Sequence, residues 1–200
     1  NSATSSASAP KSTLANQALA PTATPASTTV LTVTFDFADG NSASTTYAVY
    51  NFTSSNFLDS LGAATTTAVY QASSTWGASV SATSLSVDTA YQFKVWARNG
   101  DSTNSATSTA SAGVSTLANA AGTPTVTATG SSTLGVAIDT NGNSASTTYA
   151  IYNFTSSNFL DSAGAATTTA VYQASSTWGA SVSATGLSVD TAYQFKVWAR

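Results

Sequence analysis

The sequence contains no cysteine, histidine, methionine or glutamate. These absences exclude disulfides and thiolate chemistry, and they also exclude a serine–histidine triad, an imidazole metal site and a glutamate acid or base. All eight acids are aspartates, and the one close pair, Asp36 and Asp39, has no equivalent pair in the second half. We therefore expect a protein that is not an enzyme and that uses no cofactor or metal.

Charged residues are also scarce. They make up 6% of the chain, against about 25% in ordinary soluble proteins, and no basic stripe predicts nucleic-acid binding. No apolar run is long enough to predict a membrane span. Serine and threonine, 70 of 200 residues, supply the polarity, which is typical of extracellular and often O-glycosylated chains. The aromatic content of 10% argues against a disordered stalk, so we expect a folded extracellular protein.

An internal repeat dominates the sequence. Residues 41–98 recur as 143–200, and only three of these 58 positions differ: Val49 becomes Ile151, Leu61 becomes Ala163 and Ser84 becomes Gly186. The period of about 102 residues predicts two domains of one architecture.

Within one repeat, apolar and polar residues alternate with a period of two. Leu31, Val33 and Phe35 form one such run, and residues 46–52 and 91–97 form others. This period is typical of half-buried strands, and the turn dipeptides Asp39-Gly40 and Asn141-Gly142 separate them. The sequence therefore predicts an all-β sandwich in each repeat.

One stretch carries a family resemblance. The pattern Leu85-x-Val87-x-Thr89-x-Tyr91-x-Phe93-x-Val95-x-Ala97-x-Asn99, which returns at 187–199, resembles the signature of fibronectin type III domains around strands E and F. The resemblance implies two tandem fibronectin type III-like, immunoglobulin-like β-sandwiches, with Tyr91 and Tyr193 as tyrosine corners.

The sequence departs from that family in two places. Valine (Val87 and Val189) replaces the usual proline after the leucine, and strand B lacks a tryptophan. The insert 52–64 after strand C is similar to inserts in tandem repeats of large bacterial surface proteins. The resemblance therefore implies a prokaryotic cell-surface or extracellular filament protein.

The two ends of the sequence align with neighbouring parts of the internal repeat. Residues 1–16 agree with 104–119 at 13 of 16 positions, and Arg200 aligns with Arg98 at the end of strand F. Because residues 104–114 should form strand G, we predict an orphan strand G with linker (1–16), a complete sandwich (17–118) and a second sandwich without its last strand (119–200).

An open sandwich edge is a template for another strand. We expect the first residues of one chain to complete the second sandwich of a neighbour, which would give a head-to-tail filament or pilus-like fibre made of copies of this chain. On the expected alternation, the donor residues are Ala3, Ser5, Ala7 and Ala9, and the acceptor residues are Tyr193, Phe195, Val197 and Ala199. The pair Pro10-Lys11, where the internal copy has Gly113-Val114, favours a distinct junction between chains. The alternative is a spacer or stalk fragment of a large tandem-repeat adhesin.

Other patterns suggest weaker sites. Asn51 and Asn153 start N-glycosylation sequons, and the hydroxyl clusters 65–67, 73–75 and 102–109 are candidates for O-glycans. Tyr50, Trp96 and Trp198 should point outward, where they could stack on sugars as in a carbohydrate-binding module, unless the insert 52–64 or a neighbour covers them. The sequence around Asp139 begins like a calcium loop but lacks the closing acid, which favours a turn.

Overall fold

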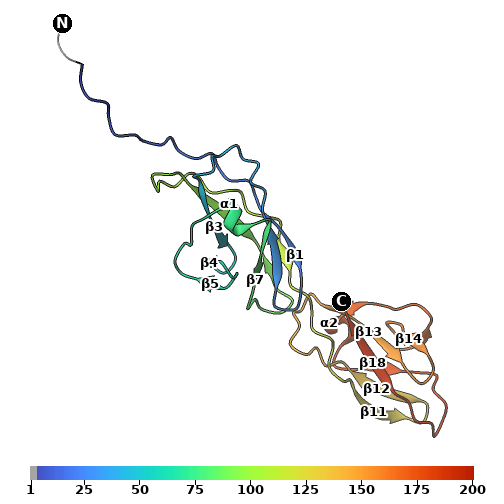
Figure 1. The fold of residues 1–200 in the computed structure, drawn as a ribbon. Coiled ribbons are helices and arrows are strands. Elements are labelled where there is room, and N and C mark those ends of the chain that lie inside the picture. Colours follow the sequence, from blue (N-terminus) through green and yellow to red (C-terminus); the bar gives the residue numbers. More distant parts are fainter. Residues whose placement is uncertain (1–3) are drawn as a thin grey trace. The chain divides into compact units, whose positions relative to one another are not determined.

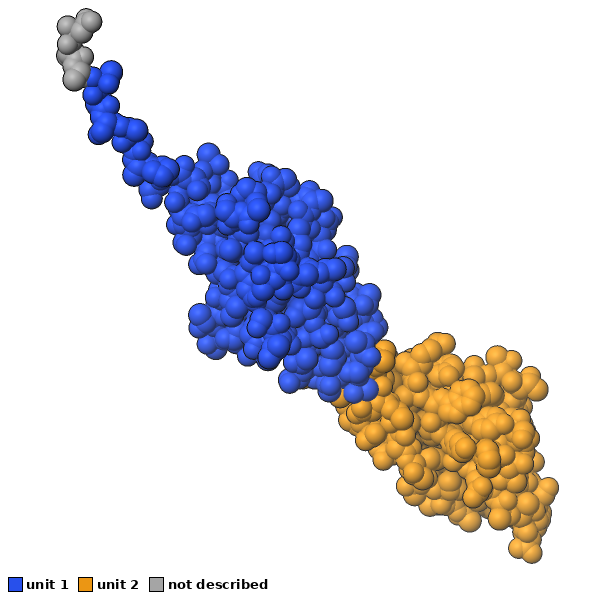
Figure 2. All heavy atoms as spheres, viewed as in Figure 1, with its two compact units in different colours: residues 1–85, 90–116 blue, residues 86–89, 117–200 orange. Residues whose placement is uncertain are grey.

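A computed structural model describes residues 4–200. The chain forms two compact units, shown in blue and orange in Figure 2. Unit 1 comprises the residues up to 85 together with 90–116, and unit 2 comprises 86–89 together with 117–200. The short segment 86–89 therefore belongs with unit 2, although it lies between strands of unit 1 in the sequence.

Unit 1 is a two-sheet sandwich. The strands β1, β2 and β7 form one sheet, and β3 is the centre of the other, with β4 and β5 continuing from it and β6 and β9 also pairing with it (Figure 1). The elements are β1 (Thr22–Pro25), β2 (Leu31–Thr34), β3 (Thr46–Asn51), β4 (Asn56–Leu58), β5 (Ala64–Thr65), β6 (Gln71–Ala72), α1 (Ser73–Trp76), β7 (Ser79–Ala82), β8 (Ala90–Tyr91), β9 (Phe93–Arg98) and β10 (Val114–Ser115).

Unit 2 repeats this plan up to strand F. Its sheets are β11-β12-β17 and a five-stranded sheet in which β13 pairs with β14, β16 and β18. The elements are β11 (Thr125–Gly130), β12 (Thr133–Ala137), β13 (Thr148–Asn153), β14 (Asn158–Leu160), β15 (Ala166–Thr167), β16 (Gln173–Ala174), α2 (Ser175–Trp178), β17 (Val182–Ala184) and β18 (Phe195–Ala199). The expected all-β class is confirmed. In each unit, one sheet holds strands A, B and E (β1, β2 and β7; β11, β12 and β17), and the other holds strands C and F (β3 and β9; β13 and β18).

Alternation places the core where the sequence predicts it. In unit 1, Leu31, Val33, Val49 and Phe93 are almost fully buried between the sheets. The one-turn helix α1 adds Trp76, whose Nε1 donates to the Tyr47 carbonyl oxygen at 2.8 Å, so its buried donor is satisfied. Trp178 and Tyr149 repeat this bond in unit 2.

A tight turn within each insert packs against strand E (β7 in unit 1, β17 in unit 2). Gly62 has φ +82°, and a Cβ there would lie 1.7 Å from the Ser81 carbonyl oxygen. Gly164 repeats both features against Ser183. Because only glycine tolerates this approach, the turn is built identically in both units.

Strand G differs from the expected pattern. Residues 104–113 do not form a regular strand, and their buried members are Ser108 and Ser111. Ala106 and Ala112 are exposed and Ala110 is half-buried, so the alternation predicted for residues 3–9 is not found in the aligned segment 106–112. The segment instead turns every third residue towards the sandwich.

Candidate assembly site at the open edge of unit 2

In unit 1, residues 105–111 cover the free edge of β9. The backbone N–H groups of Ser105, Ser108 and Ser111 donate to the carbonyl oxygens of Ala97, Val95 and Phe93, at 2.9, 2.9 and 2.8 Å. Every third residue of the segment therefore bonds every second residue of β9, which explains the three-residue spacing. Side chains between the bonding residues point away from the sandwich.

Two serine side chains complete this edge. Ser108 Oγ accepts the Val95 N–H at 2.9 Å, and Ser111 Oγ accepts the Phe93 N–H at 3.0 Å. Each serine thus exchanges two hydrogen bonds with one residue of β9, as a neighbouring strand would do through its backbone. The hydroxyls satisfy buried N–H groups that an alanine would leave unpaired.

Strand β18 of unit 2 has the sequence of β9 without this cover. It pairs with β13 in the same register that β9 has with β3, with Val197 opposite Ile151 as Val95 is opposite Val49. Among residues 4–200, nothing takes the place of Ser108 and Ser111 beside Phe195 and Val197. Val95 and Ala97 are buried, whereas Val197 and Ala199 are half-buried.

A groove borders β18. It has a volume of about 590 Å³ and is lined by the acceptor residues predicted from the sequence, Tyr193, Phe195 and Val197, together with Val126 and Phe154. A second hollow of about 570 Å³ is also lined by Tyr193, together with Leu187 and Leu134. The open edge is therefore both unpaired and partly apolar, which is the form of a strand-acceptor site.

The N-terminal segment carries the spacing that this edge requires. Aligned on residues 104–119, Ser2, Ser5 and Ser8 occupy the places of Ser105, Ser108 and Ser111. Residues 4–9 are exposed and contain no helix or strand, and the predicted donor Ala3 lies outside the described residues. Of the predicted donor set, Ser5 matches a bonding position of the internal copy. Ala3, Ala7 and Ala9 align with Ala106, Ala110 and Ala112, none of which makes a backbone bond to β9.

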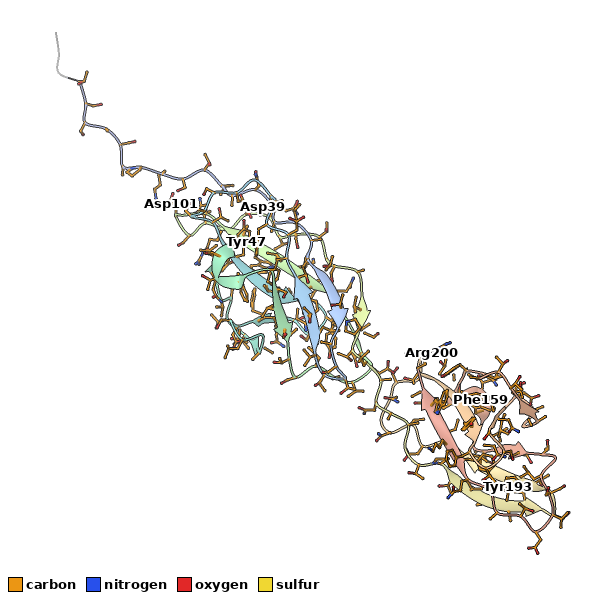
Figure 3. The ribbon with its side chains drawn as sticks, turned by 45° about the vertical axis from the view of Figure 1, so that its right-hand side comes forward. Asp39, Tyr47, Asp101, Phe159, Tyr193 and Arg200 are labelled. Carbon is orange, nitrogen blue, oxygen red and sulfur yellow. The ribbon has the colours of Figure 1, made fainter. Side chains whose placement is uncertain are left out.

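Tyr193 lies at the start of the open strand (Figure 3). Its hydroxyl accepts the Ser188 backbone N–H at 2.9 Å, which is the bond of a tyrosine corner. The hydrogen bond from Ser188 lowers the Tyr193 pKa. In unit 1 the equivalent Tyr91 is buried and pairs with Val114 of β10.

The two sequon asparagines are structural. Asn51 and Asn153 are each 2% exposed, and their Oδ1 atoms accept backbone N–H groups of Ser54 and Ser156 at 3.1 Å. A glycan on either side chain would have to displace this buried turn. The prediction of N-glycosylation at these two residues is therefore not supported for the folded chain, whereas Thr66, Thr67, Ser74 and Thr75 in the hydroxyl clusters are exposed.

The insert 52–64 covers Tyr50 and Trp96, which is one of the alternatives that the sequence left open. Phe57 from the insert packs on Tyr50 and Trp96, with ring centroids 4.9 Å from each. Lys94 Nζ lies 4.1 Å from the centre of the Phe52 ring. Tyr50 and Trp96 are half-buried, so the prediction of an exposed sugar-stacking surface in unit 1 is wrong. Trp198 of unit 2, in contrast, is 46% exposed.

The remaining candidates form turns or lack a metal-binding arrangement. Asp139 Oδ1 accepts the Asn141 N–H at 2.9 Å, and Asn141 has φ +50°, so this sequence forms a turn. Within residues 4–200, no three acidic, histidine or cysteine side chains cluster as metal ligands. No helix in the same range combines the length and apolar character that crossing a membrane requires.

One polar cluster was not predicted. In unit 2, Asp88 Oδ2 accepts the backbone N–H of Ser144 at 3.0 Å and its hydroxyl at 2.6 Å, and it also accepts the Thr147 hydroxyl. Burial raises the Asp88 pKa, but the hydrogen bonds from Ser144 and Thr147 outweigh it, so the pKa is lowered overall. The only sequence signal was that Asp88 and Ser144 both lie in repeated segments.

Comparisons with known proteins add little beyond the fold. No family model and no curated protein matches the chain. A two-domain fibronectin type III segment of chicken tenascin is similar at 11% identity and a TM-score of 0.46, covering 91% of this chain and 90% of that one. The FN1–FN3 domains of chicken CNTN1 are similar at 17% identity and a TM-score of 0.38, covering 92% of this chain and 61% of that one. The assignment of two tandem fibronectin type III-like sandwiches therefore rests on the strand order of the chain itself.

Proposed function

We propose that this chain is a structural subunit of an extracellular, pilus-like filament of a prokaryote, in which residues 1–9 of one copy complete the open edge of β18 in the next. The supporting observation is that residues 93–98 and 195–200 have the same sequence, but only the first set has a covering segment among the described residues. The segment that covers the first matches residues 1–9 at eight of nine positions, all except Ser6.

The register of the donor follows from unit 1. Ser5 takes the place of Ser108 and exchanges its N–H and Oγ bonds with Val197, and Ser8 takes the place of Ser111 beside Phe195. Lys11 then aligns with Val114, which is half-buried, so the long lysine side chain keeps its ammonium in water while its stem packs at this edge. Because donor and acceptor are different surfaces, the contact does not close on itself and extends into a fibre.

Deleting residues 1–9 tests the proposal. The truncated chain keeps both units, because residues 4–9 contribute no strand or helix to either, and it should fail to assemble under conditions in which the full chain forms fibres. Electron microscopy and sedimentation measure the difference, and a peptide of residues 1–9 should bind the truncated chain. If the truncated chain assembles like the full one, the donor-strand mechanism is wrong.

A disulfide trap tests the register, since the chain has no cysteine of its own. Ser5→Cys with Val197→Cys should link neighbouring chains into a covalent ladder on a non-reducing gel. Ser108→Cys with Val95→Cys is the matched internal control, because these residues share a 2.9 Å backbone bond and should link within one chain. Ala7→Cys with Val197→Cys should not link, because its internal equivalent, Ala110, makes no bond to Val95.

The second candidate is a spacer in a large tandem-repeat surface adhesin. The observation in its favour is the near-identity of the two repeats, which differ at three of 58 positions. In such an array the segment covering β18 would come from the same polypeptide. A full chain that remains monomeric, and does not bind the 1–9 peptide, would favour this candidate over the filament.

A further inference from the structure

The two segments that form the Asp88 cluster in unit 2 each occur a second time in the chain, but the second copies are not in contact. The loop 86–89 recurs as 188–191, and the turn 42–45 is identical to 144–147. In unit 2 the first loop binds the second turn through Asp88, Ser144 and Thr147. The other two members, Asp190 and the Ser42–Thr45 turn, lie in different units.

Both unmatched halves already have the bound conformation. Asp190 has φ +52°, close to the +47° of Asp88, so the backbone of the two loops has the same left-handed conformation at the aspartate. The Ser42 and Ser44 hydroxyls are 2.8 Å apart, as those of Ser144 and Ser146 are 2.6 Å apart. The Thr45 N–H donates to the Ser42 carbonyl oxygen at 3.0 Å, repeating the bond of Thr147 to Ser144.

Exposure differs at two of the three bonding residues. Asp88 and Ser144 are half-buried, whereas Asp190 and Ser42 are exposed. Thr45, like Thr147, is buried. The Asp190 carboxylate accepts no hydrogen bond from residues 4–200. A hollow of about 350 Å³ lies beside the Ser42–Thr45 turn, between Ser12 and Gly100.

The linker that leads to each turn is fixed in the same way. Asn119 donates its N–H to Asn143 Oδ1 at 2.7 Å, and Asn143 Nδ2 donates back to the Asn119 carbonyl oxygen at 2.9 Å. Asn16 and Asn41 repeat this pair in unit 1, at 2.6 and 3.2 Å. Leu14 follows Ser8 by six positions, as Leu117 follows Ser111, and the Leu117 carbonyl oxygen accepts the Asp88 N–H at 3.3 Å.

From these matches we infer that Asp190 of one copy binds the Ser42 and Thr45 hydroxyls of the copy whose residues 1–9 occupy its β18 edge, forming a second contact at every junction of the filament. The inference rests on the proposed function, because the donor segment determines which turn reaches Asp190. It adds a site made by two chains, in which a carboxylate of one accepts from a serine–threonine turn of the other.

The test compares Asp190→Ala with Asp88→Ala in the full chain. Hydrogen bonds to a charged group are worth more than neutral ones, so losing this cluster should raise the concentration needed for half-assembly by about tenfold to hundredfold. Sedimentation across a concentration series measures it. Asp190 is exposed, so its replacement leaves the fold of unit 2 intact. Asp88→Ala removes the same chemistry from unit 2 itself and should leave the assembly concentration unchanged.

A peptide experiment separates this inference from the proposed function. The 1–9 peptide contains neither Ser42 nor Thr45, so it should bind the truncated chain equally well with Asp190 or with alanine there. If the peptide does not bind at all, the donor-strand proposal and this inference both fail. If the peptide binds both chains but Asp190→Ala assembles like the unmodified chain, only the inference is overturned.

A double-mutant cycle checks the direct contact. Asp190→Ala combined with Ser42→Ala should cost no more than the larger of the two single changes, since both remove one interaction. Ser144→Ala is the matched control for Ser42→Ala and should leave the assembly concentration unchanged, both alone and combined with Asp190→Ala. Additive effects of Asp190→Ala and Ser42→Ala would show that the two residues do not meet.

Discussion

The two strands β9 and β18 have the same sequence but different surroundings. In β9, Phe93, Val95 and Ala97 are buried under residues 105–111, and Trp96 is half-buried. In β18, Val197 and Ala199 are half-buried and Trp198 is 46% exposed. Because residues 41–98 and 143–200 are almost identical in sequence, unit 1 serves as a reference for the uncovered β18 edge of unit 2. The comparison shows that strand alternation alone does not bury a strand whose edge is open.

The largest expected difference between the two units is the loss of stability when one valine of the strand is replaced by alanine. Val95→Ala removes side-chain volume from a closed core and should lower the free energy of unfolding of unit 1 by about 2–3 kcal/mol. Val197→Ala should cost about half as much in unit 2, because Val197 is only half-buried.

Fluorotryptophan labelling followed by ¹⁹F NMR during urea unfolding can separate the two units. The buried Trp76 reports on unit 1 and the buried Trp178 on unit 2. Equal losses from the two alanine substitutions would contradict the view that the β18 edge is incomplete. Adding the 1–9 peptide should raise the cost of Val197→Ala towards that of Val95→Ala.

A smaller effect is expected from the serines of the covering segment. Ser111→Ala leaves the buried Phe93 N–H without its acceptor and should destabilise unit 1 by about 1–2 kcal/mol. Ser8→Ala, its counterpart at the N-terminus, should leave the unfolding of the isolated chain unchanged and weaken fibre assembly instead. A loss of monomer stability from Ser8→Ala would show that the N-terminal segment already has a role within its own chain.

A spectroscopic difference should accompany assembly. Trp198 is exposed whereas Trp96 is half-buried, so the 1–9 peptide should shift the ¹⁹F signal of Trp198 towards the position of Trp96 and leave Trp96 unmoved. Trp198→Phe identifies the signal. A shift of Trp96 with no change at Trp198 would place the peptide on the wrong unit.

Much of the fold could be predicted from the sequence, because period-two alternation and an almost exact repeat are strong signals. The positions of Leu31, Val49 and Phe93 in the core follow directly from them. The alignment of Arg200 with Arg98 predicted in the same way that β18 has an uncovered edge among the described residues. These features depend on local pattern alone.

The errors arose where side chains bond to backbone. The covering segment was expected to alternate, but Ser108 and Ser111 use their hydroxyls as strand acceptors, which imposes a period of three. The spacing of Ser2, Ser5 and Ser8 was visible in the sequence, yet a serine-rich segment offers many such spacings. Asn51 was predicted as a surface sequon, and only the structure shows that its side chain is inside a turn.

The smallest expected difference between the two units is in the pH dependence of their stability. It arises where the sequences of the repeats differ, at Asp39 and its counterpart Asn141. The Tyr47 hydroxyl donates to Asp39 at 2.9 Å (Figure 3), and burial together with the nearby Asp39 carboxylate raises the Tyr47 pKa to about 12. In unit 2 the equivalent Tyr149 hydroxyl donates instead to the Thr140 carbonyl oxygen at 3.3 Å. Unit 1 therefore has an aspartate–tyrosine contact for which unit 2 has no counterpart.

The sign of the pH effect follows from the raised pKa. An unfolded tyrosine ionises near pH 10 while folded Tyr47 stays neutral, so its contribution to stability is complete below about pH 10 and is lost as the pH rises to about 12. Unfolding of unit 1, followed at Trp76, should become easier across this window, and Tyr47→Phe should flatten the dependence. Asp39→Asn should reduce it in part, because burial is the larger cause of the shift. An unchanged pH profile in Tyr47→Phe would assign the effect to another tyrosine of unit 1 and leave Asp39 a purely local role in its turn.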